Sequence, residues 1–521
     1  MRSPWLSREY KLCEDLIIET TNNTYCLNNP SLNTKLEIDK AEYEKLKNNK
    51  LNEIEWEKYF LRGLAEDING YRVQIAKDLV LPKGYSKKPE VRTFVLPVHS
   101  ENMHIIINPD MGSWIALTKD EFRRYESDSL TKYEWESLFL RGLCNAQGCE
   151  FELEHQPPAE YPSVVVVNIT TNCNLRCKYC FANCGDFDGE DMSIDVMESI
   201  IKNMLEMPVN LVTFEFQGGE ASLNYDGMKK FIEIAEVEKL KHPDKEVKYR
   251  TEINCVDISD EFIQLLKTYN ISTGFSLDGP KKCNDMYRID TEGKGTYDRV
   301  MAGVRRLQNA GIDIDGSVCT IGQHNVRYPK EIMKLFNDLQ ISFKPRPINV
   351  LGREIKNNLT TAPGEWAQCY SEMYKMKDEV DIDNFSIHIF EENVFTPIRD
   401  YICLRYPCGA AREIVSVNPD GTIYPCDGFK GEKLFIMGNI LEESLFDMLK
   451  KPEIVKLRSR TAKDINQCST CLFRGMCCSC CYSAYGKFGD IYREDPHCLD
   501  KRKIYLFLMQ TWLEQHIANN E

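Results

Sequence analysis

The stretch TTNCNLRCKYCF, Thr170 to Phe181, contains three cysteines in the spacing CxxxCxxC: Cys173, Cys177 and Cys180. It follows a hydrophobic run, Val164 to Ile169, that predicts a β-strand, so the cysteines fall on the loop at the strand's carboxyl end. Three thiolates can hold three irons of a cubic iron–sulfur cluster and leave the fourth iron without a protein ligand. An open coordination position is typical of catalytic metal sites. The alternative is a closed structural zinc site, completed by a fourth Cys or His.

Downstream of this loop, apolar strand patterns alternate with amphipathic helix patterns. Strands are predicted over Val164–Ile169, Leu211–Phe216, Val247–Ile253, Ile271–Ser276, Ile312–Cys319 and Ile341–Pro347. Helices are predicted between them, over Ile194–Leu205, Met228–Val237, Asp260–Tyr269, Tyr297–Gln308 and Val326–Leu339. Six β–α units in series predict an α/β fold with a parallel sheet and helices outside it. In barrels built from such β–α units, active sites lie at the carboxyl ends of the strands, and the cysteine loop also falls at such an end.

Two further motifs follow predicted strands. Gly218-Gly219-Glu220 comes after the second strand, where glycines allow the backbone to approach closely and a carboxylate suits an ammonium group. The sequence SLDGP, residues 276–280, comes after the fourth strand. The alternative for Asp278 is a simple turn, because Asp-Gly suits turns.

The C-terminal third is rich in cysteine. Cys408 is followed by Gly421 and Cys426, and a later group reads CxxCx5CxxxC with one more cysteine beyond it: Cys468, Cys471, Cys477, Cys481 and Cys498. Cys403, just upstream, is a candidate eighth ligand. A zinc ribbon is the alternative for the CxxC pair. Two inner cysteines, Cys478 and Cys480, leave the ligand register near Cys481 open.

The CxxxCxxC motif with an aromatic before its last cysteine, one β–α unit ahead of the GGE turn, resembles the signature of the radical S-adenosylmethionine (radical SAM) superfamily. The SLDGP stretch, with Asp285 and Arg288 after it, is similar to that of the peptide-modifying members. The resemblance implies a partial (β/α)6 barrel and a 4Fe–4S cluster whose free iron chelates the methionine moiety of S-adenosylmethionine. It implies cofactor contacts from Tyr179, Gly218, Gly219, Glu220, Asn254, Ser276 and Asp278.

The C-terminal cysteines resemble the seven-cysteine SPASM extension, which holds two auxiliary 4Fe–4S clusters that accept or relay an electron. The resemblance assigns one cluster to a first auxiliary set, Cys403, Cys408, Cys426 and Cys481. It assigns the other to a second auxiliary set, Cys468, Cys471, Cys477 and Cys498. The remaining cysteines, such as Cys184, are predicted to be ordinary thiols.

Asp427 directly follows Cys426 in YPCDGF. Anaerobic sulfatase-maturating enzymes, which this chain resembles over roughly residues 160 to 500, carry a proposed general base at the matching place. A carboxylate beside cluster and substrate could accept a proton as the substrate is oxidised. The alternative is a loop aspartate that makes backbone hydrogen bonds.

The N-terminal region contains an internal duplication with an offset of 79 residues. EWEKYFLRGL, Glu55 to Leu64, recurs as EWESLFLRGL, Glu134 to Leu143, and flanking residues match without gaps. This predicts two copies of one small α/β module, each with extended segments, a turn (NPDMG, 108–112, in the second) and helices. Such modules could present a sheet edge or groove to a peptide.

Composition limits the class of protein. The chain has 521 residues, a net charge of −15, 28% charged and 42% hydrophobic residues, which is ordinary for a soluble globular protein of two to four domains. We find no basic stripe with interleaved aromatics and do not expect nucleic acid as a partner. No secretory signal and no apolar run of about 18 residues is present, so no membrane partner is predicted. Twenty-two cysteines in such a chain indicate metal or redox chemistry in the cytoplasm.

The leading hypothesis is a peptide maturase that forms a thioether or carbon cross-link in a ribosomally made precursor, with a flavodoxin- or ferredoxin-like electron donor. The alternatives are oxidation of a sulfatase Ser or Cys to formylglycine, and a non-catalytic, cluster-bearing peptide-binding or electron-transfer protein. The predicted domains are module copies at 1–80 and 81–158, the radical SAM core at 159–355 and a linker at 356–400. A loop-dominated cluster domain at 401–500 and a C-terminal helix at 501–521 complete the chain.

Overall fold

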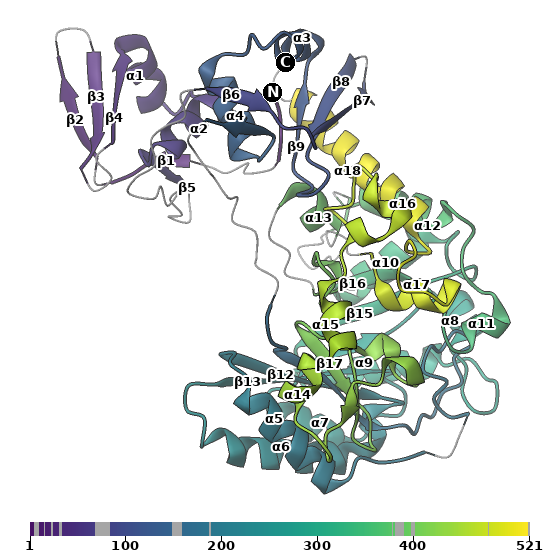
Figure 1. Cartoon of the computed structure of the whole chain (residues 1–521). Helices are drawn as coiled ribbons and strands as arrows, with labels where there is room; N and C mark the ends of the chain where they lie inside the picture. Colours follow the sequence, from purple (N-terminus) through teal and green to yellow (C-terminus); the bar gives the residue numbers. More distant parts are fainter. Residues whose placement is uncertain are drawn as a thin grey trace.

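The computed structural model describes residues 1–4, 10–14, 16–21, 24–30, 34–67, 84–99, 101–147, 159–186, 189–377, 379–380, 390–396, 402–477 and 479–518. Two small N-terminal modules lie at one end of the molecule and the large α/β core at the other, joined by a long C-terminal helix, α18 (Cys498–Ala518) (Figure 1). No helix among the described residues is long and apolar enough to cross a membrane.

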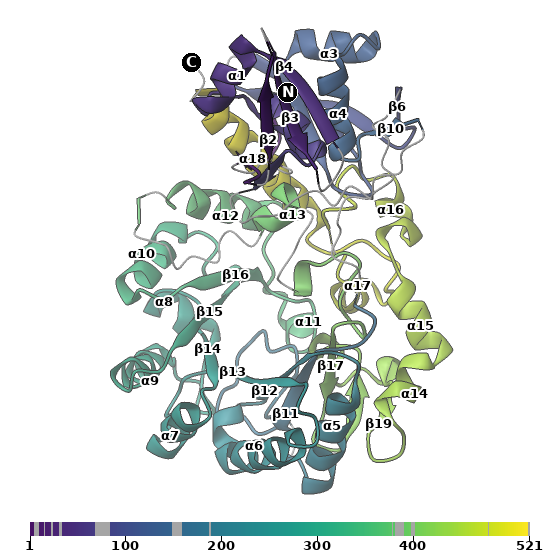
Figure 2. The ribbon, with the colours of Figure 1, turned by 90° about the vertical axis from the view of Figure 1, so that its left-hand side faces the viewer.

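The core contains six parallel strands that pair in sequence order. They are β11 (Val164–Thr170), β12 (Leu211–Gly218), β13 (Glu246–Ile253), β14 (Ser272–Ser276), β15 (Ile314–Ile321) and β16 (Phe343–Pro347). Helices cover the outside of this curved sheet (Figure 2): α5 (Ile194–Glu206), α6 (Tyr225–Lys239), α7 (Asp260–Thr268), α9 (Tyr297–Asn309) and α10 (Pro329–Leu339). The predicted strand and helix order and the parallel sheet are confirmed. Among the named strands β16 pairs only with β15, so no closed barrel is formed.

The cysteine-rich C-terminal part adds three strands to the same sheet. β17 (Ile414–Val417) runs parallel to β11, and β18 (Thr422–Tyr424) and β19 (Gly438–Asn439) follow it in antiparallel order. The loop-dominated character expected for this region is therefore only part of its structure. The short apolar sequence IVSV satisfies the edge of β11, whose backbone groups need a partner when buried. This pairing brings the segment after Cys426 beside β11, where Lys430 contacts Asn168.

The predicted linker at 356–400 is helical in much of its described part. It contains α11 (Glu354–Asn357), α12 (Glu365–Lys375) and α13 (Glu391–Phe395). On α12, Trp366 and Tyr370 are buried in the main core cluster with residues of α18. Because α12 is amphipathic, its apolar face packs against the core, and this segment does not run through solvent as a linker would.

The two N-terminal modules have the same order of elements. Module 1 comprises β1 (Tyr10–Leu12), β2 (Ile17–Thr20), β3 (Thr24–Asn29), β4 (Thr34–Asp39), α1 (Lys40–Lys47), α2 (Glu53–Leu61) and β5 (Ala65–Asp67). Module 2 comprises β6 (Tyr85–Lys87), β7 (Arg92–Val98), β8 (Glu101–Ile107), β9 (Trp114–Leu117), α3 (Lys119–Glu126), α4 (Lys132–Leu140) and β10 (Cys144–Ala146). The bounds of α1 and α3, of α2 and α4, and of β5 and β10 each differ by 79 residues.

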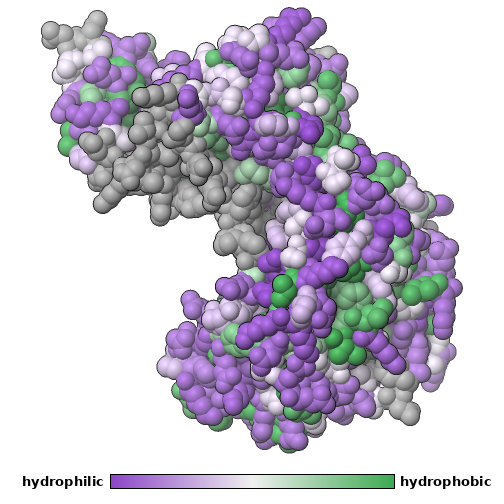
Figure 3. Space-filling view, viewed as in Figure 1, coloured by the Kyte–Doolittle hydropathy of each residue, from purple (hydrophilic) through white to green (hydrophobic). Residues whose placement is uncertain are grey.

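The sheet face that points away from the module's own helices explains why the sheet of module 2 packs into the main core and that of module 1 does not. In module 2 that face is apolar and belongs to the main core: Ile105, Ile107, Trp114 and Ala116. At the positions 79 residues earlier, module 1 has polar or small side chains: Cys26, Asn28, Lys35 and Glu37. Burying charged side chains without partners is costly, so this face of module 1 stays in solvent. Hydrophilic residues predominate over module 1 in the space-filling view (Figure 3).

The modules contact each other through α2 and α4 with approximate two-fold symmetry. Arg62 of module 1 pairs with Glu136 of module 2 at 2.8 Å, and Arg141 of module 2 pairs with Glu57 of module 1 at 2.5 Å. All four side chains are buried. Arg141 is the equivalent of Arg62 in the other module, 79 residues later, and Glu136 is likewise the equivalent of Glu57. The two ion pairs are therefore equivalent and the contact is self-complementary, as in a symmetric dimer.

Candidate active site

The CxxxCxxC loop leaves the carboxyl end of β11 and is held there by neighbouring backbone. The Arg176 and Lys178 N–H groups donate to the carbonyls of Ile289 and Tyr287 at 2.7 and 3.0 Å. Cys173, Cys177 and Cys180 are all half-buried and unpaired by disulfides. Burial raises the pKa of the Cys173 thiol to about 12 and that of Cys177 to about 11. The Cys173 and Cys177 thiols are therefore protonated until a metal displaces their protons, which coordination does outright. A hydrogen bond with the Cys184 side chain instead lowers the pKa of Cys180 to about 5.

The GGE turn lies directly against this loop. The Gly219 and Glu220 N–H groups donate to the Thr170 and Asn172 carbonyls, each at 2.8 Å. A Cβ at Gly218 would stand 2.0 Å from the Thr170 oxygen, and one at Gly219 would stand 2.1 Å from the Asn172 oxygen. Side chains do not fit at either place, so the glycines are required for this approach.

Glu220 and Asn254 connect the turn to the third strand. The buried Glu220 carboxylate accepts from the Asn254 N–H at 2.6 Å and from the Ser222 hydroxyl at 2.6 Å. The Asn254 side chain in turn donates to Asn174 of the cysteine loop at 2.7 Å. Burial raises the pKa of Glu220. The structure thus brings the predicted cofactor contacts at the ends of β12 and β13 together beside the cysteine loop.

Tyr179 and Asp278 belong to a buried network behind the cluster loop. The Tyr179 hydroxyl donates to Asp278 Oδ2 at 2.6 Å and accepts from Arg288 at 3.0 Å. His324 Nε2 lies 3.2 Å from the same Asp278 oxygen, and the other oxygen accepts from the Thr320 N–H at 3.1 Å. Asp278 is fully buried, so in this arrangement both its oxygens serve to orient protein groups. No motif surrounds His324, which the sequence reasoning did not identify.

Ser276 sits at the end of β14 beside an interior acid. Its hydroxyl donates to Glu252 Oε1 at 3.2 Å. Gly274 leaves the room for that side chain, since a Cβ there would stand 2.3 Å from Glu252 Oε2. Burial and the neighbouring Glu215 carboxylate raise the pKa of Glu252 to about 8. Both acids line a polar cavity inside the sheet together with Lys344.

The segment after β16 also holds the cysteine loop in place. The Arg353 guanidinium donates to the carbonyls of Cys177 at 3.0 Å and Cys184 at 2.7 Å, and pairs with Asp186 at 2.6 Å. Its own N–H donates to the Cys180 carbonyl at 3.0 Å. Sequence reasoning missed Arg353, because a single Gly-Arg after the last strand carries no signal by itself.

Asp427 reaches the same region because β17 lies beside β11. Its Oδ1 is 3.0 Å from Lys430 Nζ and accepts from the Ser416 hydroxyl at 3.3 Å. The Lys430 ammonium also donates to Asn168 of β11 at 3.0 Å and lies 5.0 Å from the centre of the Phe181 ring. The Lys430 side chain is 8% exposed and the Asp427 side chain is 15% exposed. One oxygen of the predicted base is thus anchored, and the sequence reasoning had not identified Lys430.

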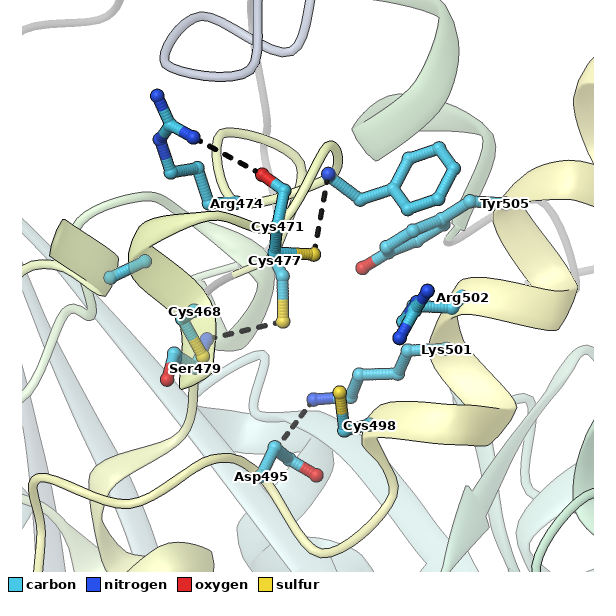
Figure 4. Close-up of a pocket in the computed structure, with 12 residues that line it drawn as sticks. Cys468, Cys471, Arg474, Cys477, Ser479, Asp495, Cys498, Lys501, Arg502 and Tyr505 are labelled. Carbon is cyan, nitrogen blue, oxygen red and sulfur yellow. Dashed lines mark hydrogen bonds and ion pairs between the residues drawn. The ribbon is translucent and has the colours of Figure 1, made fainter. Parts of the chain in front are cut away.

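The second auxiliary set surrounds a single cavity. Cys468, Cys471, Cys477 and Cys498 line it with Arg474, Lys501 and Tyr505, and their sulfurs face its interior (Figure 4). Within the described part of the chain, no three His, Cys, Asp or Glu side chains are close enough to hold one metal ion. Four cysteines around one cavity are the donor set that a 4Fe–4S cluster takes.

The first auxiliary set is gathered less completely. The Cys408 and Cys481 sulfurs are 4.0 Å apart. Burial, then the neighbouring thiols of Cys408 and Cys480, raise the pKa of Cys426. Cys403 is exposed. Cys480 is therefore close to this group as well as Cys481, while Cys478 lies outside the described residues, so the ligand register there stays a prediction.

Comparison with known proteins supports this arrangement. Residues 167–336 match the family model of the Radical SAM superfamily, and residues 408–472 match the SPASM iron-sulfur cluster-binding domain. A cysteine-type anaerobic sulfatase-maturating enzyme of Clostridium novyi is 26% identical over 337 residues, spanning 61% of this chain and 87% of its own. A serine-type enzyme of Bacteroides thetaiotaomicron is 24% identical over 358 residues, spanning 62% and 83%.

Solved structures show the same fold. The structure titled native anSMEcpe with bound AdoMet superposes with a TM-score of 0.59 at 19% identity, over 68% of this chain and 99% of its own. Streptococcus suis SuiB bound to S-adenosylmethionine gives a TM-score of 0.50 at 15% identity, over 94% of this chain and 99% of its own. The SuiB fold therefore extends into the N-terminal region.

The fold and the cysteine sites define an iron–sulfur enzyme with a central parallel sheet. The chain contains a radical SAM domain and a SPASM domain, and the resemblance seen in the sequence is confirmed. Its cofactors are 4Fe–4S clusters and S-adenosylmethionine, as predicted. Which cysteines hold which cluster, and which residues contact the S-adenosylmethionine, stay predictions.

Proposed function

We propose that this enzyme is a peptide maturase that forms a thioether or carbon cross-link in a ribosomally made precursor. The observation that carries the proposal is the pair of N-terminal modules. The anSMEcpe structure aligns over 99% of its own length but covers only 68% of this chain, so part of this chain has no counterpart in it. A region of this size ahead of the core suits the capture of a peptide segment that is separate from the modified residues.

The edge of module 1 offers a place for such capture. β2 is the first strand of the sheet β2-β3-β4 and pairs only with β3 among the named strands. Its Ile17 and Ile18 side chains are 48% and 40% exposed. An extended peptide can add to an open edge through backbone hydrogen bonds, with side chains giving specificity. An uncovered apolar edge strand without such a role would be an aggregation hazard.

At the core, Cys173, Cys177 and Cys180 would hold the catalytic cluster, and the GGE turn would contact the methionine moiety. When bound, the cluster and S-adenosylmethionine supply a carbon-centred radical that removes a hydrogen atom from an unactivated carbon. Cross-linking also removes a second hydrogen from the peptide as a proton, together with one electron that an auxiliary cluster would accept. Asp427 would accept this proton. In support, Lys430 and Ser416 contact its Oδ1, and none of the described residues donates a hydrogen bond to Oδ2.

Mass spectrometry of precursor peptide treated with reduced enzyme tests the reaction. A cross-link gives a product lighter by two hydrogens that does not react with hydrazide probes. A second candidate, formylglycine formation in a sulfatase, is favoured by the sulfatase-maturating relatives. Its product is an aldehyde that hydrazide traps. Failure to form 5′-deoxyadenosine with fully loaded clusters would instead favour a non-catalytic, cluster-bearing protein.

The capture role of module 1 needs point variants, because module 2 is built into the core. Ile18→Lys places a charge on the free edge and is expected to raise the KM for full-length precursor at least tenfold, with kcat unchanged. Val95→Lys is the matched control, because Val95 is an exposed apolar residue (50%) on β7 of module 2. Equal KM values for wild type and the Ile18 variant would refute capture at this edge.

A cytoplasmic location and a flavodoxin- or ferredoxin-like electron donor are also proposed. None of the twenty cysteines that the structure describes is in a disulfide. So many cysteines without disulfides, together with clusters, suit a reducing compartment.

A further inference from the structure

The turn at residues 108–112 distinguishes module 2 from module 1. Module 2 reads NPDMG where module 1 reads NPSLN, so an aspartate, Asp110, stands in place of a serine. Asn108 holds the turn: its side chain donates to the Gly142 carbonyl at 3.0 Å and accepts from the Asp110 N–H at 3.0 Å. The Asp110 carboxylate pairs with Arg474 and Lys463 of the cysteine-rich domain.

The turn packs against the loop 471–477, which carries two members of the second auxiliary set. The Gly475 N–H donates to the Pro109 carbonyl at 2.7 Å. A Cβ at position 475 would stand 2.5 Å from the Asp110 carbonyl oxygen and 2.6 Å from the Gly112 nitrogen. These are backbone atoms that cannot move aside alone. The loop and the turn are therefore in close backbone contact that only glycine allows.

The Asp110 carboxylate makes two ion pairs across this contact. Oδ1 is 2.7 Å from Arg474 Nε, and Oδ2 is 3.1 Å from Lys463 Nζ. Burial opposes ionisation of Asp110, but hydrogen bonds from Arg474 and Lys463 outweigh it and hold the pKa below its usual value. Arg474 also donates to the Cys471 carbonyl at 3.3 Å and lines the cavity of the four cysteines (Figure 4).

We propose that Asp110 is a positioning residue for the second auxiliary cluster. Through Arg474 it fixes the loop 471–477 and sets the charge around the cluster that Cys468, Cys471, Cys477 and Cys498 hold. The reduction potential of an iron–sulfur cluster depends on nearby charge, hydrogen bonds and solvent exposure. The duplicated N-terminal region is then a structural part of an electron-transfer site, in addition to any role in peptide capture. The proposal rests on the ligand assignment of the second auxiliary set and not on the identity of the substrate.

The test compares Asp110→Asn with wild type in full-length protein, purified anaerobically with its clusters loaded. Asp120→Asn is the matched control, because Asp120 lies on α3 of the same module and is 81% exposed. Two readouts are used: amide hydrogen exchange of residues 471–477, and the midpoint potentials of the auxiliary clusters from an EPR-monitored redox titration. Asp110→Asn is expected to speed exchange of the loop at least tenfold. It should also raise the potential of one auxiliary cluster, because a negative charge is removed.

Further variants separate positioning from general damage. Gly475→Ala is expected to speed exchange of the same loop, since it forces the two backbones apart. Asp110→Glu keeps the charge and should leave the potential near that of wild type; a shift as large as that of the Asn variant would overturn the proposal. Wild-type exchange and potentials in Asp110→Asn would also overturn it. The proposal would also be overturned if exchange in β11–β16 became faster by the same factor, because the variant would then have destabilised the whole protein.

Discussion

Replacing Arg62 by Met tests whether the two N-terminal modules form one structural unit. The Arg62 and Glu136 side chains are 4% and 1% exposed and lie 2.8 Å apart. Removing one partner of a buried pair leaves the other charge uncompensated, at a cost of about 3–5 kcal/mol. Lys132 is 3.9 Å from Glu136 but 55% exposed, and the Tyr85 hydroxyl is 3.5 Å away. These weak substitutes favour the lower end, about 3 kcal/mol, or roughly a hundredfold in an opening equilibrium.

Native-state hydrogen exchange on the full-length chain measures this effect in α2 and α4. Arg62→Met is expected to speed the exchange of the slowest-exchanging amides there about a hundredfold, because their exchange rate is proportional to the equilibrium constant for opening. The double variant Arg62→Met with Glu136→Leu should recover most of the protection, because a well-packed apolar pair often replaces a buried ion pair without loss. By the internal symmetry, Arg141→Met should act like Arg62→Met. Less than a threefold change, or a double variant as labile as the single one, would refute the reasoning.

Three further predictions concern the core. Lys430→Met should reduce peptide modification about a hundredfold at unchanged iron content, because Asp427 loses its anchor; turnover measured by mass spectrometry within threefold of wild type would contradict this. Arg353→Met should speed iron loss to a chelator, since it removes the guanidinium hydrogen bonds to the Cys177 and Cys184 carbonyls and the ion pair with Asp186. Each lost hydrogen bond from a charged donor costs about 1.5–3 kcal/mol, and equal loss rates would argue against this role of Arg353. Glu252→Gln should flatten the dependence of stability on pH. With a folded-state pKa raised to about 8 from 4.5, this acid holds a proton that the unfolded chain releases. Its contribution therefore falls as pH rises through that window, by at most about 1.4 kcal/mol per unit, and an unchanged slope of Tm between pH 5 and 8 would exclude it.

The sequence identified most of what is local. Strand and helix order followed from hydrophobic periodicity, because each element of the core buries one face or both. The cysteine loop and the GGE turn were found because their chemistry requires particular residue types at fixed spacing, and the structure places both at the carboxyl ends of adjacent strands. The duplication was visible as repeated letters. Its consequence, reciprocal ion pairs between Arg62 and Glu136 and between Arg141 and Glu57, required knowing that α2 and α4 meet.

What the tertiary structure decided is which distant segments become neighbours. Lys430 and Asn168 are 262 residues apart and bond only because β17 takes the free edge of β11. Arg353 and His324 became site residues through packing onto the cluster loop, and Asp110 through a turn that meets a glycine at position 475. Periodicity and motif spacing report the environment that a residue needs, apolar or polar, coordinated or free. They do not report its partner, because long-range packing selects that partner among many chemically equivalent ones.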